Sequence, residues 1–214
     1  MADTTTTPPI ERRYVQNLEL RADGDEPPKI TGYAAVFNAL SVPLGGFRES
    51  IRKGAFKRTL KAKADVRALV NHDPNLIIGR SLAGTLTLKE DDHGLLVEID
   101  PPDTTAGRDV VESIRRGDID GMSFGFQTVK DSWEYSADGT DDRRELLDVE
   151  LFDVSPVTFP AYPDTDVAVR SQDVQAALAS REAARPTPEP MDWKHNIDLA
   201  RRKLRLAEAE AESV

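Results

Sequence analysis

Residues 121–126 have the sequence Gly-Met-Ser-Phe-Gly-Phe, and the interpretation of this stretch decides the fold. It fits either the G-x-S-x-G pattern around a serine nucleophile or a glycine-rich bend between two strands. In an α/β-hydrolase the serine of that pattern lies on a sharp turn from a strand into a helix. Here a helix is predicted before Ser123, and residues 123–129 have strand character. The stretch therefore predicts that Ser123, if it is a nucleophile, is carried on a β-strand.

The sequence on both sides of Ser123 predicts a mainly β protein with few helices. Apolar and β-branched runs bounded by turn signals indicate strands, and two alternating runs joined by Asp-Asp-His-Gly indicate a hairpin. Apolar residues spaced three or four apart indicate helices. The predicted strands are 29–38, 65–73, the hairpin 82–102, about 122–130 and 145–163; the predicted helices are 54–63 and 104–121; an acidic turn is predicted at 131–144.

Composition divides the chain into three parts. Residues 1–28 are polar and rich in Thr and Pro, so we expect a flexible segment in which residues 12–22 could hold a first strand. Residues 29–170 contain the predicted strands and form one domain. Residues 171–214 are rich in alanine and charge, and we expect helices at 172–184 and 192–212. Neither has a broad apolar stripe, so these helices are expected to be marginal or to depend on a partner.

Charge and cysteine content exclude several classes of function. The chain has 214 residues, with 28 Lys and Arg against 38 Asp and Glu, for a net charge of −10. Such a balance argues against a nucleic-acid partner, because phosphate binding needs clustered positive charge. The chain has no cysteine, which removes disulfides, thiol nucleophiles and thiolate metal sites. We see neither a signal peptide nor a long apolar run, and we expect a protein that is not secreted, binds no membrane and needs no metal or cofactor.

A serine nucleophile needs a base, and the chain offers three histidines. His93 falls at the tip of the predicted hairpin, and His195 lies in the tail beyond the prolines. His72 remains, at the end of an apolar strand and before an Asp-Pro turn signal. A structural interpretation stays open: His72 could be a strand-end residue capped by Asp73, and Ser123 a small residue packed where strands approach closely.

Five motifs, in this order and at these spacings, make the chain similar to a known family. They are ITGYAAVFN (30–38), FRESIRKGAF (47–56), LVNHDPNLIIGR (69–80), GDIDGMSFGF (117–126) and LFDVSPVTFPAYP (151–163). Over roughly residues 29–170 the chain resembles the tailed-phage prohead proteases, the capsid maturation proteases, which are related to the herpesvirus assembly proteases. The resemblance implies a bent, mostly antiparallel β-barrel with flanking helices and a Ser–His pair on the barrel.

The resemblance also implies a function and its surroundings. The expected activity is that of a serine endopeptidase that cleaves scaffold or the scaffolding segment of the major capsid protein, and itself, during procapsid maturation. The expected partners are therefore the major capsid protein, scaffold and further copies of the chain, and the expected place is the procapsid in the host cytoplasm. Residues 171–214 would then be a scaffold-targeting or self-cleaved segment.

By position, the resemblance assigns the nucleophile to Ser123 and the base to His72. The third residue must accept a hydrogen bond from the other ring nitrogen of His72. The herpesvirus enzymes use a second histidine on the strand after the serine, but this chain has none between 94 and 194, so a carboxylate is expected. We choose Asp153, with Glu150 as its nearest rival.

Strand alternation places Leu151, Asp153 and Ser155 on one face, and Glu150, Phe152 and Val154 on the other, so only one of the two acids can serve. Glu49 and Asp73 are more distant candidates for the acid. The donors of an oxyanion hole stay open: Gly121, Gly125 and residues 155–163 are considered, and none is chosen.

Three other functions remain to be weighed. The chain could be a non-catalytic capsid assembly or scaffold protein that keeps Ser123 and His72 as relics, against which the intact motifs around both residues argue. A lipase-like esterase is disfavoured by the order of helix and strand around Ser123. A metal hydrolase has the least support, because one core histidine and no cysteine cannot easily supply a zinc site.

Overall fold

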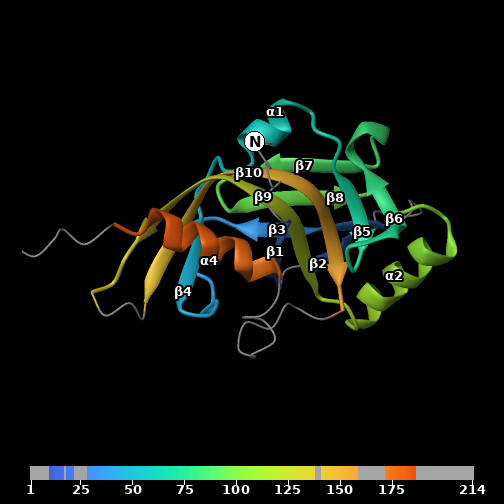
Figure 1. Cartoon of the computed structure of the whole chain (residues 1–214). Coiled ribbons are helices and arrows are strands. Elements are labelled where there is room, and N and C mark those ends of the chain that lie inside the picture. The colour runs from blue at the N-terminus through green and yellow to red at the C-terminus, as the bar shows by residue number, and fades with distance from the viewer. Residues whose placement is uncertain (1–9, 17, 22–27, 138–140, 159–171, 187–214) are drawn as a thin grey trace, which may run out of the picture. The chain divides into compact units, whose positions relative to one another are not determined.

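The computed structural model describes residues 10–16, 18–21, 28–137, 141–158 and 172–186. The chain forms two units, residues 1–184 and 185–214, and the helices and strands named here belong to the first. In chain order they are β1 (Glu11–Val15), β2 (Leu18–Arg21), β3 (Lys29–Val36), β4 (Phe47–Ile51), α1 (Lys57–Lys61), β5 (Arg67–Val70), β6 (Asp73–Arg80), the 3₁₀ helix η1 (Ser81–Ala83), β7 (Leu86–Glu90), β8 (Gly94–Ile99), α2 (Thr105–Arg116), β9 (Gly121–Glu134), β10 (Asp142–Val157) and α4 (Gln172–Ala184) (Figure 1).

The strands form two sheets that are connected at both edges. The larger sheet has the order β1-β9-β10-β5-β6, with β4 also paired to β10, and the smaller has the order β2-β3-β8-β7. The edge strands β1 and β2 follow one another in the chain, and β6 leads through η1 into β7 (Figure 1). The expectation of a mainly β fold with flanking helices is confirmed. One departure from the antiparallel pattern is that β10 runs parallel to both β4 and β5.

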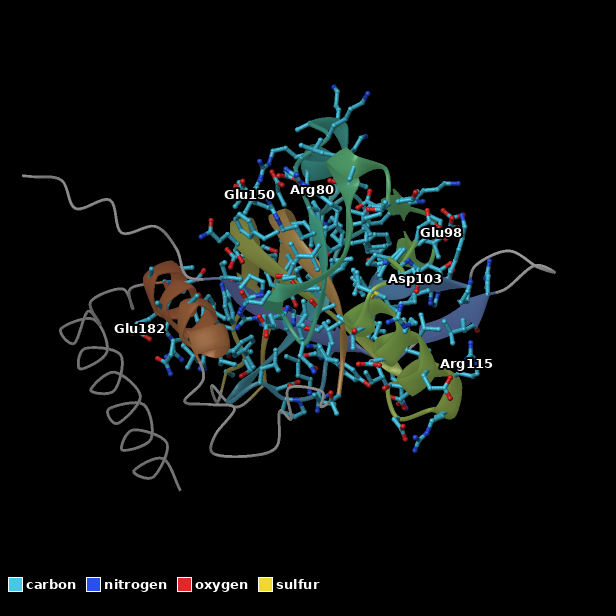
Figure 2. All side chains as sticks on the ribbon, turned by 90° about the vertical axis from the view of Figure 1, so that its right-hand side faces the viewer. Arg80, Glu98, Asp103, Arg115, Glu150 and Glu182 are labelled. Carbon is cyan, nitrogen blue, oxygen red and sulfur yellow. The ribbon has the colours of Figure 1, made fainter. Side chains whose placement is uncertain are left out.

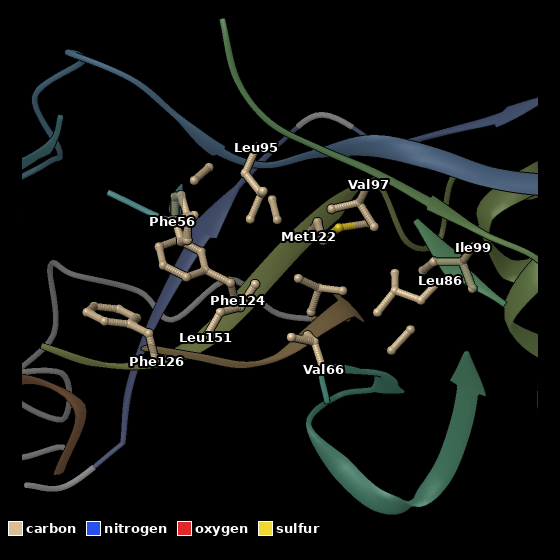
Figure 3. Close-up of a cluster of buried hydrophobic side chains, with 14 of the residues drawn as sticks. Phe56, Val66, Leu86, Leu95, Val97, Ile99, Met122, Phe124, Phe126 and Leu151 are labelled. Carbon is tan, nitrogen blue, oxygen red and sulfur yellow. The ribbon is translucent and has the colours of Figure 1, made fainter. Parts of the chain in front are cut away.

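The larger cluster of buried hydrophobic residues lies between the inner faces of the two sheets (Figure 3). On β9 it receives Met122, Phe124 and Phe126, which are all fully buried. Because side chains alternate along a strand, Gly121, Ser123 and Gly125 lie on the opposite face. The GMSFGF stretch is thus a regular strand with one face in the core and the other carrying the serine.

The helix before β9, predicted within 104–121, begins at Thr105 and ends at Arg116. The Thr104 hydroxyl accepts a hydrogen bond from the Gly107 N–H at the first turn, and Gly117 ends the helix with a φ of 79°. Val110, Val111 and Ile114 are buried on one face. The predicted strands at 29–38 and 122–130 and the hairpin 82–102 are also present, as β3, β9 and β7–β8.

Two parts of the larger sheet differ from the expectation. The predicted acidic turn at 131–144 is wrong at both ends, because β9 continues to Glu134 and β10 begins at Asp142. The FRESI segment, to which no element was assigned, forms β4 beside the start of β10. Several charged side chains of these segments, among them Glu49, Asp131 and Arg144, are paired with one another away from solvent.

Arg144 lies at the centre of this buried charged network and is 1% exposed. Its Nη1 donates to Glu11 on β1 at 2.6 Å and to Glu49 on β4 at 2.9 Å, and its Nε donates to Asp131 on β9 at 2.7 Å. Arg13 supplies a second guanidinium, which donates to Glu49 at 2.7 Å and to Glu11 at 2.9 Å. One side chain of β10 therefore fixes β1, β4 and β9 together.

The network keeps Glu11 ionised although the residue is buried. Burial alone would raise the pKa of Glu11, but the hydrogen bond from Arg144 and the charges of Arg13 and Arg144 outweigh it, so the pKa of Glu11 lies below its ordinary value. The glutamate is then negatively charged at neutral pH, which is the state that two neighbouring guanidinium groups require.

Helix α4 lies in the segment that composition had set apart as a tail, and it packs against the larger sheet. Val174 and Ala177 are buried with Phe47 of β4. The Ser180 hydroxyl donates to Asp131 at 2.9 Å, and Arg181 Nε donates to Asp142 at 2.7 Å. The helix expected at 172–184 is thus present, and it contacts β1, β4, β9 and β10 of the same unit.

Replacing Arg144 tests how far the fold depends on this network. We expect Arg144→Met to lower the free energy of unfolding by about 3–5 kcal/mol, because it leaves Glu11 and Glu49 buried without their main partner. Arg143→Met is the matched control, since the Arg143 side chain is 53% exposed, and it should cost less than about 1 kcal/mol. Urea unfolding measures both, and equal midpoints for the two variants would show that the network contributes little.

Candidate active site

Ser123 lies on β9 between two neighbouring strands of the larger sheet. Its register partner on β1 is Tyr14, and its partner on β10 is Ser155. Directly opposed residues in antiparallel strands have their Cβ atoms about 4.5–5.5 Å apart and share a face of the sheet. Ser123 is 6% exposed, so its hydroxyl lies in a largely enclosed position bordered by these two side chains.

His72 lies in the two-residue turn between β5 and β6. Val70 pairs with Asp73, and both turn residues have positive φ, 53° at Asn71 and 58° at His72. Positive φ at both positions is the mark of a type I′ hairpin turn, in which asparagine is well tolerated but glycine would be usual at the second position. A non-glycine residue in the left-handed region costs about 1–2 kcal/mol. His72 is therefore near a strand end, as predicted, but it lies within the turn in a strained conformation, and Asp73, which was expected to start the turn, begins β6.

The end of β10 fixes the turn that carries His72. The Asn71 N–H donates to the carbonyl oxygen of Pro156 at 3.0 Å. The Asn71 side chain donates to the Thr158 hydroxyl at 3.0 Å and accepts from the Thr158 N–H at 2.9 Å. These bonds attach His72 to the strand that also carries Asp153.

Asp153 reaches the same site through a β-bulge. The β9–β10 pairing shifts between Leu151, which pairs with Phe126, and Asp153, which pairs with Gly125. Leu151 accordingly lies in the hydrophobic core, while Asp153 faces the serine. The prediction that Leu151 and Asp153 share a face is wrong, because the bulge interrupts the alternation between them.

The three predicted residues form one hydrogen-bonded chain. His72 Nδ1 lies 2.5 Å from Asp153 Oδ1, and His72 Nε2 lies 2.7 Å from Ser123 Oγ. A carboxylate only accepts hydrogen bonds, so it fixes the imidazole proton on Nδ1 and leaves Nε2 free to accept from the serine hydroxyl. In such an arrangement His72 can accept the proton of Ser123, and Asp153 can stabilise the imidazolium that forms.

The two glycines of the G-x-S-x-G stretch make space for neighbouring side chains. A Cβ atom at Gly125 would lie 2.3 Å from Asp153 Oδ2, and one at Gly121 would lie 2.1 Å from the Tyr14 ring. Gly125 is paired on both sides, to Arg12 and to Asp153, so it belongs to a regular strand and not to a bend. The candidate oxyanion donors at 159–163 lie outside the described residues.

The rival acids and histidines lie elsewhere. Glu150 is exposed at the surface and pairs with Gln127 (Figure 2). Glu49 belongs to the Arg144 network, and the Asp73 carboxylate accepts from the N–H of Asn75. His93 is exposed at the hairpin tip, and His195 lies outside the described residues.

Ser155 and Gly125 are site residues that sequence analysis did not assign. The Ser155 hydroxyl donates to Asp153 Oδ1 at 2.8 Å, and Gly125 leaves room for Oδ2. The sequence signals were the serine two residues after the chosen acid and the glycine two residues after the nucleophile. Neither could be interpreted without the register of β9 on β10.

The described residues contain neither a cluster of metal ligands nor a helix that could span a membrane. Over these ranges, no group of three or more His, Cys, Asp and Glu side chains is arranged to hold a metal ion. Over the same ranges, no helix has the length and apolar character needed to cross a membrane.

A serine, a histidine and a buried carboxylate in this order of contact define the class of serine hydrolases. The sequence pattern of the caudovirus prohead serine proteases matches residues 16–180, and the chain belongs to this family. Among solved structures, the bacteriophage T4 capsid assembly protease, gp21, is similar with a TM-score of 0.42 and 13% identity, over 69% of this chain and 98% of that one. No curated protein matches the chain.

Gly125→Ala tests whether the glycine makes room for the acid. The added methyl group has to displace the Asp153 carboxylate, so we expect the rate at which a fluorophosphonate reagent labels Ser123 to fall about 100-fold or more. In an Asp153→Ala background the methyl has nothing to displace, so the same substitution should cost less than about 3-fold. Equal losses in both backgrounds, measured by intact mass against time, would exclude this role.

Proposed function

We propose that the chain is a serine endopeptidase in which Ser123 is the nucleophile, His72 the general base and Asp153 the residue that orients His72. The observation that carries the proposal is the continuous contact from Ser123 Oγ through both ring nitrogens of His72 to Asp153 Oδ1. A serine hydroxyl is a weak nucleophile unless such a base accepts its proton.

Hydrolysis would proceed in two steps. Ser123 Oγ attacks the carbonyl carbon of the peptide bond, its proton passes to His72 Nε2, and Asp153 stabilises the imidazolium. The C–N bond then breaks, and the Nε2 proton goes to the departing amine, which leaves an acyl group on Ser123. His72 next removes a proton from water, whose oxygen attacks the acyl carbon. The bond from that carbon to Ser123 Oγ then breaks, the proton passes from His72 Nε2 to Oγ, and the new carboxyl end is released from the free serine.

The proposed substrates are scaffold, or the scaffolding segment of the major capsid protein, and the protease chain itself. Membership of the prohead protease family supports this choice. The proposed place of action is the procapsid in the host cytoplasm, where copies of the chain would gather with scaffold. The net charge of −10 gives no support to a nucleic-acid substrate.

Co-expression with the neighbouring capsid protein tests the activity. We expect the wild type to cut itself or the capsid protein, and Ser123→Ala and His72→Ala to leave every chain at full length, because each removes a group that the reaction needs. Ser132→Ala is the matched control, since Ser132 is exposed on the same strand. Intact mass spectrometry of all fragments gives the result.

If wild type and Ser123→Ala give the same uncut masses in procapsids that have fully assembled, the protease proposal fails. The chain would then be a capsid assembly or scaffold component, and Ser123 and His72 would have a structural role.

We further propose that the residues after α4 target the protease to scaffold or are removed by self-cleavage, on the basis of their charge and proline content. A truncated chain tests this proposal. Because α4 packs against β4, the truncation removes only residues 187–214 and keeps α4. The shortened protein should be labelled by a fluorophosphonate at the wild-type rate, because the site lies outside the removed segment. It should enter procapsids at less than about a tenth of the wild-type level, a loss larger than ordinary few-fold effects of mutation. Unchanged incorporation, measured on purified procapsids, would refute targeting, and a wild-type chain that keeps residues 187–214 would refute self-cleavage.

A further inference from the structure

Ser155 makes a hydrogen bond to the acid of the site. It lies on β10 directly opposite Ser123 and is completely buried. Its hydroxyl donates to Asp153 Oδ1 at 2.8 Å, and the same oxygen is 2.5 Å from His72 Nδ1. The chain of contacts that begins at Ser123 therefore does not end at Asp153.

We propose that Ser155 is a positioning residue that holds the Asp153 carboxylate in the orientation His72 requires. The inference rests on the proposed protease function, since it assigns a role within that site. Ser155 touches neither the nucleophile's hydroxyl nor the imidazole in the contacts described, so it would act through Asp153.

The surroundings of Asp153 explain why such a contact is needed. Asp153 follows the bulge in β10, so the regular alternation of the strand does not by itself fix the direction of its side chain. On the Oδ2 side lies Gly125, which offers no side chain to hold the carboxylate. Ser155 and His72 then define the position of Oδ1 from two directions.

The chemistry of a buried serine gives the bond its direction. A hydroxyl has one proton to donate, and leaving it without an acceptor in a buried site is costly. By donating a hydrogen bond to Asp153, the Ser155 hydroxyl stabilises the charged form of the carboxylate. Two charged residues lie at paired positions beside the carboxylate. Arg12 on β1 is paired with Gly125, and Arg67 on β5 is paired with Asp153. The Arg67 side chain donates to Asp65 at 3.1 Å.

A fluorophosphonate reagent provides a test that needs no knowledge of the natural substrate. Ser123 Oγ attacks phosphorus, the P–F bond breaks, fluoride leaves, and the hydroxyl proton passes to His72 Nε2. The rate of this reaction, followed by intact mass from about pH 5 to 9, reports the state of His72. The variants are Ser155→Ala, Ser155→Thr and Ser81→Ala. The last is the matched control, because Ser81 Oγ makes two hydrogen bonds, to Ala64 and Val66, away from the site.

We expect Ser155→Ala to be labelled about 10- to 100-fold more slowly, the factor for one lost hydrogen bond to a charged group. The pH at which the rate is half-maximal should also fall, because an Asp153 carboxylate that is no longer held toward His72 Nδ1 stabilises the imidazolium less. Ser155→Thr keeps the hydroxyl and should keep the wild-type half-maximal pH, even if its extra methyl lowers the melting temperature. Ser81→Ala should lose stability without a change in rate.

The outcomes separate this inference from the proposed function. If the wild type is not labelled at Ser123 at all, the protease proposal itself fails. If the wild type is labelled and Ser155→Ala has the same rate and the same half-maximal pH, only the positioning role is refuted. A slower rate in Ser155→Ala with an unchanged half-maximal pH would also refute it, because that result is what general destabilisation produces.

Discussion

Every strand of the larger sheet is attached, directly or through one neighbour, to the antiparallel pair formed by β9 and β10. The same pair carries Ser123 and Asp153, so its register sets the geometry of the site as well as the order of the sheet. A slip of one residue would turn Ser123 into the hydrophobic core and Phe124 out of it. Burial of Met122, Phe124 and Phe126 therefore holds the serine in place, and the stability of the core and the geometry of the site depend on one pairing.

The charged network around Arg144 secures this pair at its other end. Arg144 on β10 bonds to Asp131 on β9 and to Glu11 on β1, and β1 is the strand that borders Ser123. A buried network of this kind adds less net stability than its bonds suggest, because the charges have lost their water. Its effect is on arrangement: in the observed register of β1, Glu11 lies beside Arg144 of β10 and Thr128 of β9. We infer that the network selects the position of β1 beside the serine more than it strengthens the fold.

The sequence predicted the features that depend on local pattern, but it did not predict those that depend on contacts between distant segments. The strand character of residues 123–129 correctly placed Ser123 on a strand, and elimination among three histidines led to His72. The Arg144 network could not be predicted, because Arg144 and Glu11 are 133 residues apart and each alone resembles a solvated charge. The bulge before Asp153 was hidden for the same reason. It is a property of β10 paired with β9, and alternation along β10 alone wrongly gave Leu151 the same face as Asp153.

The three residues of the site differ in how regular their backbone is. Ser123 lies in a regular strand, Asp153 follows a bulge, and His72 has a φ of 58° in a tight turn. Strain of this kind persists only where surrounding contacts over-determine the conformation. Here the bonds from Asn71 to Pro156 and Thr158 supply those contacts, and they come from the strand that also carries the acid. Base and acid are thus held by one strand, so a movement of β10 would shift both together relative to the serine.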